Sequence, residues 1–88
     1  MILESEIEIG EIYKYICHSY SIFYFRVLKK CNETPYKRYR LFKCKVLYSK
    51  NDWTIFKAGS IFNITSLELN RVHKVSKFDL DYLMVEAL

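Results

Sequence analysis

The sequence predicts one small, mainly β domain over residues 1–88, built as a barrel of about five antiparallel strands. Three observations predict this fold class. Apolar and polar residues alternate with a period of two over most of the chain, and turn-forming residues separate the alternating runs. Hydrophobic residues make up 51% of the 88 residues, which is enough for one core. The chain is too short to build a second core.

The first two strands are predicted over residues 3–9 and 12–17. In the first, the leucine and isoleucines fall on one face and the glutamates on the other, which predicts an acidic strand. Gly10 then gives the chain a place to bend. The segment IYKYIC at 12–17 is rich in β-branched and aromatic residues, which favour strands.

A long hairpin is predicted over residues 20–48. The segment NETPY at 32–36 holds the only proline of the chain and predicts the reversal. On the outgoing strand the alternation assigns three residues to the core: Phe23, Phe25 and Val27. On the return strand it assigns four residues to that same buried face: Phe42, Cys44, Val46 and Tyr48.

Residues 53–64, WTIFKAGSIFNI, predict two further short strands that place Trp53 and Ile55 in the core. They would reverse at 57–60, where Gly59 can adopt a positive φ. Next, TSLE at 65–68 has the spacing of a capping box and predicts a helical turn through Val72.

The tail, SKFDLDYLMVEAL, fits two structures. Ser76 and Asp79 have the spacing of another capping box, and Asp79 and Asp81 suit the N-terminus of a helix. A strand fits the same residues.

The order of these segments resembles that of SH3-like barrels. The resemblance is carried by GEIYKY, the long hairpin, FKAGSIFNI with its glycine turn before the fourth strand, and the helical turn SLELNRV before the last strand. It covers residues 7 to 75, while the acidic leading strand and the tail depart from it. The resemblance implies a binding scaffold and no particular ligand.

Charge is unevenly distributed along the chain, whose net charge is +4. Residues 1–11 carry four glutamates and no base, whereas residues 14–50 carry ten bases and one acid. An acidic first strand lying on the basic surface would mask it. The start of the chain lacks the pattern of a signal peptide and no apolar run is long enough for a membrane span, so we expect a cytoplasmic protein without membrane contact.

The sequence predicts no metal site, no cofactor and no catalytic residue. Cys17, Cys31 and Cys44 are 14 and 13 residues apart, and neither they nor the two histidines, His18 and His73, show the spacing of zinc ligands. Free thiols are therefore expected. No third group that would orient a cysteine–histidine pair is evident, and no glycine-rich phosphate loop is present, so we expect no enzyme.

The strongest functional signal is YKRYRLFKCKVLY at 36–48, where five bases are interleaved with aromatic and aliphatic residues. Lysine and arginine can neutralise phosphates, and exposed tyrosines can stack on bases. The candidate binding residues share one predicted outer surface or the adjoining turn: Tyr24, Arg26, Tyr36, Arg38, Tyr39, Arg40, Lys43 and Lys45. A structural explanation competes with this one, because lysines on strands also keep a sheet from pairing with neighbouring molecules.

Two functions follow from this pattern. The first is a non-enzymatic module that binds nucleic acid. The alternative is an inhibitor or adaptor that binds a host protein, because arginine and tyrosine are also enriched in protein interfaces. Isoleucine, lysine, asparagine, tyrosine and phenylalanine total 37 residues, which indicates AT-rich codons. A bacteriophage or its low-GC host is one source with such a genome, and the inhibitor would then be a phage product.

Overall fold

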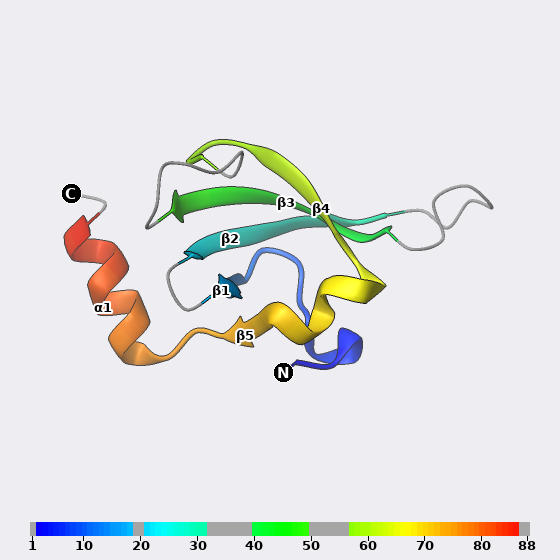
Figure 1. Ribbon diagram of the computed structural model, residues 1–88, viewed down its shortest axis with the longest axis horizontal. Helices are drawn as coiled ribbons and strands as arrows, with labels where there is room; N and C mark the ends of the chain where they lie inside the picture. The colour runs from blue at the N-terminus through cyan, green and yellow to red at the C-terminus, as the bar shows by residue number, and fades with distance from the viewer. Residues whose placement is uncertain (1, 19–20, 32–39, 50–56, 87–88) are drawn as a thin grey trace.

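The computed structural model of the chain describes residues 2–18, 21–31, 40–49 and 57–86. Five antiparallel strands form one sheet in the order β4-β3-β2-β1-β5 (Figure 1). The elements in chain order are η1 (Glu4–Glu6), β1 (Ile12–His18), β2 (Ser21–Lys30), β3 (Arg40–Ser49), β4 (Ile61–Thr65), η2 (Ser66–Arg71), β5 (Val72–Lys74) and α1 (Lys77–Glu86). The mainly β class with five strands is confirmed. In the described part of the chain β4 and β5 are the two edges of the sheet, so a closed barrel is not observed.

One face of the sheet, here called the inner face, carries the core. The predicted core residues Phe23, Phe25, Val27, Phe42 and Val46 are all buried, as the alternation requires. The inner face is largely aromatic: the ring of Tyr15 stacks on Phe23 with centroids 4.6 Å apart, and Phe62 meets Phe23 and Phe25 edge-on. Trp53 and Ile55 lie outside the described residues, as does the predicted reversal at 32–36.

The predicted acidic strand at 3–9 is wrong. Residues Glu4–Glu6 form a short 3-10 helix, and the flanking Ile2 and Ile7 are both buried in the core. The hydroxyl of Tyr13 holds this segment, since it donates to the Glu6 carbonyl at 3.2 Å and accepts from the Glu8 N–H at 2.8 Å. A single open sheet leaves one side of its core uncovered, and the N-terminal segment covers that side instead of pairing as a strand.

The turn and the helix predicted after it are both confirmed. Gly59 has φ +92°, which a residue with a side chain rarely adopts, and its N–H donates to the carbonyl of Val46 at 2.8 Å. In the capping box before η2, the N–H and the hydroxyl of Thr65 donate to Oε1 of Glu68 at 3.2 and 2.9 Å. The other carboxylate oxygen of Glu68 accepts from the buried Tyr15 hydroxyl at 2.7 Å, so the cap also fixes η2 to β1.

The ambiguous tail is a helix, α1, which lies at one end of the sheet (Figure 1). Its N-terminus has the predicted capping box. The Ser76 hydroxyl accepts from the Asp79 N–H at 3.2 Å, and both the N–H and the hydroxyl of Ser76 donate to Oδ2 of Asp79. A strand could not make these reciprocal bonds, which explains why the helix forms.

We expect Phe25→Ala to unfold most of the protein at room temperature. The Phe25 side chain is fully buried, and truncating a buried phenylalanine costs ~3–5 kcal/mol, comparable with the whole stability of a domain this small. Urea unfolding followed by circular dichroism measures the effect. Phe78→Ala is the matched control, because Phe78 is 79% exposed and its loss should leave the unfolding midpoint nearly unchanged.

Candidate functional site

The outer face of the sheet, opposite the core, carries a row of residues that crosses four strands. The strand register pairs Arg26 of β2 with Lys45 of β3, and the row continues to Ile12 on β1 and Ile61 on β4. Directly opposite residues share a face, so the side chains of Arg26 and Lys45 project side by side from the outer face. This confirms the prediction that Arg26 and Lys45 lie together on one outer surface.

A bulge adds a second pair of cations beside the first. Val27 pairs with Cys44, but the next pair along is Lys29 with Lys43, so Leu28 is the extra residue of β2. Lys29 is thereby brought onto the outer face. We call Arg26, Lys29, Lys43 and Lys45 the basic quartet.

The quartet is electrostatically unbalanced. Arg26, Lys29 and Lys45 are exposed and Lys43 is half-buried. Among the described residues the ion pairs are Lys14 with Asp79 and Lys74 with Glu6, and no carboxylate pairs with the quartet. Like charges directly opposite on neighbouring strands are destabilising, by roughly 0.2–1 kcal/mol per pair. Folding alone does not favour this arrangement, and an anionic ligand would relieve it.

Apolar side chains border the quartet. Leu28, at the bulge, is 39% exposed, and Ile61, opposite Lys45, is 51% exposed. On the other side of Lys43, the half-buried Asn63 lies opposite it on β4. The Oδ1 atom of Asn63 accepts from the thiol of Cys31 at 3.6 Å. The surface is therefore a band of cations with apolar neighbours.

The prediction that Tyr24 is exposed is wrong. Tyr24 lies on the outer face as expected, but it is only 5% exposed, because the first turn of α1 covers it. Its hydroxyl donates to Oδ1 of Asp79 at 3.0 Å, and its ring lies beside Tyr48 with centroids 6.5 Å apart. Tyr24 therefore anchors α1 and offers no open ring to a base.

Tyr48 was predicted on the same face as Phe42, Cys44 and Val46, and this is also wrong. Tyr24 pairs with Tyr48, but Phe25 pairs with Val46, so Leu47 is an extra residue in β3. One extra residue moves every following side chain to the opposite face. Tyr48 is half-buried on the outer face as a result.

Of the other predicted site residues, Arg40 is exposed at the first position of β3, opposite Thr65. Tyr36, Arg38 and Tyr39 lie outside the described residues. Lys29 was missed by the sequence analysis, because strict alternation does not reveal the bulge that turns it to the outer face.

Asp79 is the polar centre that joins α1 to the sheet. Its carboxylate accepts from Lys14 of β1 at 3.1 Å and from Tyr24 of β2 at 3.0 Å, in addition to the bonds from Ser76. The Asp79 side chain is only 13% exposed. Burial raises the pKa of Asp79, but the hydrogen bonds from Ser76, Lys14 and Tyr24 outweigh burial and lower its pKa to about 2.

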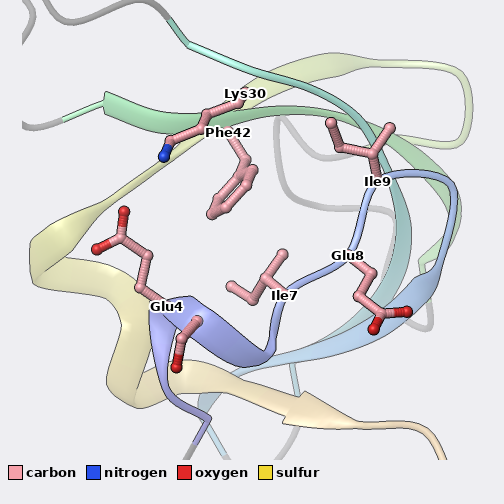
Figure 2. Close-up of a pocket in the computed structure, with 7 residues that line it drawn as sticks. Glu4, Ile7, Glu8, Ile9, Lys30 and Phe42 are labelled. Carbon is pink, nitrogen blue, oxygen red and sulfur yellow. The ribbon is translucent and has the colours of Figure 1, made fainter.

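The acidic N-terminal segment does not mask the basic quartet. Ile2 and Ile7 pack into the inner-face core, so the segment lies on the opposite side of the sheet. An open hollow of about 620 Å³ lies there, bordered by Glu4, Glu8 and Lys30, with Ile7 and Phe42 among its apolar lining (Figure 2).

The cysteine thiols and His73 lie outside any cluster of metal-binding side chains in the described part of the chain. Within the residues that the structure describes, no group of three or more histidine, cysteine or acidic side chains could hold a metal ion. Burial raises the pKa of the Cys17 thiol, raises that of the Cys44 thiol to about 12, and lowers the pKa of His73. Both thiols are therefore poor nucleophiles at neutral pH.

Comparison with protein families, curated proteins and solved structures finds no match to this chain. None of the helices in the described residues has the length and apolar character needed to cross a bilayer.

We expect Asp79→Asn to lower the free energy of unfolding by ~2 kcal/mol at pH 7, because the folded pKa of about 2 lies below the ordinary value of 3.8. The stability that a depressed carboxyl pKa provides is complete above the unfolded pKa and is lost as the pH falls through the folded one. The difference between wild type and variant should therefore shrink between about pH 4 and pH 2.

Urea unfolding at several pH values measures this difference. Asp81→Asn is the matched control, since Asp81 lies on the same helix and is exposed. Equal effects of the two variants, or a difference that does not change with pH, would contradict the role of Asp79.

We expect a thiol reagent to modify Cys17 and Cys31 in the native protein much faster than Cys44. The first two are half-buried, whereas Cys44 is fully buried and its pKa is raised to about 12. Counting modified thiols by mass spectrometry against time, with and without urea, checks the order. Modification of Cys44 at the same rate as Cys17 would show that β3 opens readily.

Proposed function

We propose that this chain is a non-enzymatic binding module that holds the phosphates of nucleic acid on the basic quartet. The observation that carries the proposal is the direct pairing of Arg26 with Lys45 and of Lys29 with Lys43, without a carboxylate partner among the described residues. Phosphates are the ligand that compensates four adjacent cations, and counterion release makes such binding favourable.

The scaffold supports a binding role. The turn at Gly59 comes just before β4 and the 3-10 helix η2 comes just before β5, the two features on which the resemblance to SH3-like barrels rests. We propose an SH3-like arrangement, acting in the cytoplasm, in which the sheet supplies a rigid surface. A fold of this kind does not by itself specify the ligand, so the charge pattern carries the functional argument.

A second candidate is the phage-type inhibitor or adaptor that binds a host protein. It is favoured by two exposed apolar residues at the quartet, Leu28 near Arg26 on β2 and Ile61 opposite Lys45, because apolar residues among basic ones are typical of protein interfaces. Salt dependence separates the candidates, since phosphate binding weakens steeply with salt and an apolar interface weakens less. The phosphate proposal is preferred because four cations without an acid exceed what an interface centre usually contains.

We expect the double variant Arg26→Gln/Lys45→Gln to bind mixed oligonucleotides more weakly and with a smaller dependence on salt. Losing two phosphate contacts should reduce the slope of log K against log salt by about 1.8 on duplex, at ~0.9 per contact. The same variant should be as stable as wild type or more stable by up to ~0.5 kcal/mol, because a like-charge pair has been removed.

Lys30→Gln/Lys77→Gln is the matched control. It removes the same total charge, but Lys30 borders the hollow on the inner face and Lys77 begins α1 (Figure 2). The control should keep most of the affinity. Equal losses in both double variants would assign the binding to net charge alone, and no wild-type binding at low salt would remove the nucleic-acid proposal and leave the protein partner.

A further inference from the structure

We infer that the basic quartet recognises the sugar–phosphate backbone of duplex nucleic acid independently of base sequence, and does not stack the bases of a single strand. This inference rests on the proposed function and names the ligand class of the same site. Two observations carry it: the outer face keeps the four cations of the basic quartet, and α1 covers the ring of Tyr24.

The strands of the outer face offer little surface for stacking. Two tyrosines, Tyr24 and Tyr48, lie on the described part of this face, and the burial of Tyr24 under Asp79 places its ring out of reach of a base. Tyr48 is half-buried against Tyr24. Proteins that bind single strands rely on aromatic side chains on which successive bases stack, so this surface lacks their main source of affinity.

The quartet also lacks the means to read base edges. Three of its four members are lysines, which act as point charges, and Arg26 alone has the planar fork that recognises guanine in a groove. Of the neighbours, Leu28 and Ile61 have no side-chain hydrogen-bonding groups, and Asn63 is half-buried with its Oδ1 atom accepting from the Cys31 thiol. Contacts that fix a protein on the phosphates carry no sequence information, so affinity should vary little between sequences.

Duplex is the denser polyanion. It carries one charge per ~1.7 Å of its axis, and each neutralised phosphate contributes more counterion release on duplex than on a single strand. A site that binds through charge alone therefore favours duplex. A site that stacks bases instead binds a single strand more tightly than duplex.

The test measures the affinity of the intact wild-type chain for a mixed-sequence duplex and for each of its two separate strands, at several salt concentrations. We expect duplex to bind more tightly than either strand, with a slope of log K against log salt near −3.6, at ~0.9 for each of four contacts. An AT-rich and a GC-rich duplex of equal length should bind within about threefold of each other, less than the effect of one mismatched base pair on a specific reader.

Two variants keep the inference open to contradiction. Phe78 is exposed on α1, and Tyr36 and Tyr39 lie outside the described residues, so Phe78→Ala and Tyr36→Ala/Tyr39→Ala remove three further rings on which a base could stack. We expect both to leave affinity unchanged. Tighter binding of a single strand, or an approximately tenfold loss in either variant, as for one stacked base, would overturn the inference while the proposed function stands.

Failure of the proposed function has a different signature. If neither duplex nor single strand binds at low salt, the quartet is not a nucleic-acid site and both proposals fall together. If duplex binds but Arg26→Gln/Lys45→Gln and Lys29→Gln/Lys43→Gln bind it equally well as wild type, the duplex site lies elsewhere on the chain, and the inference about the quartet is overturned.

Discussion

Burial of one face of β2 and β3 fixes most other features of this molecule. Phe25 and Val46 face each other across the two strands, as do Val27 and Cys44, and all four are fully buried. A slip of one residue would turn the apolar side chains outward, so this packing holds the register. Because the register is fixed in this way, Arg26 lies opposite Lys45.

The same constraint gives the two faces of the sheet different energetic roles. The inner face is apolar and is completed by Ile2 and Ile7 from the N-terminal segment. The outer face carries a local electrostatic cost that the core can sustain, because a few tenths of a kcal/mol per pair is small beside the burial of a single phenylalanine. Residues on the outer face can therefore be selected for binding, because folding does not determine which residue stands there.

Much of the sheet could be predicted from the sequence because alternation reports directly which face of a strand is buried. The buried Phe23, Phe25 and Val27 follow from this alternation. The glycine turn and the capping boxes at Thr65 and Ser76 could be predicted because each is a local sequence signal. The failures concern residues whose position depends on distant parts of the chain.

Two examples show this. The extra residues Leu28 and Leu47 shift the register only relative to the partner strand, so alternation within one strand could not reveal that Tyr48 changes face. Tyr24 was expected to be exposed because its partner Asp79 lies 55 residues away. Three of the four residues of the basic quartet, Arg26, Lys43 and Lys45, were predicted because they follow the alternation. Lys29 was missed because the bulge at Leu28 depends on the partner strand.

The two bulges also shape the surface on which the cations lie. A bulge increases the local right-handed twist of its strand pair, and the one at Leu28 falls between the pair Arg26–Lys45 and the pair Lys29–Lys43. We therefore expect the two charge pairs to be rotated relative to each other about the strand direction, so that they do not lie in one plane. A planar anionic surface, such as a lipid bilayer, meets only one pair squarely, whereas a polyanion whose charges wind around an axis can follow both.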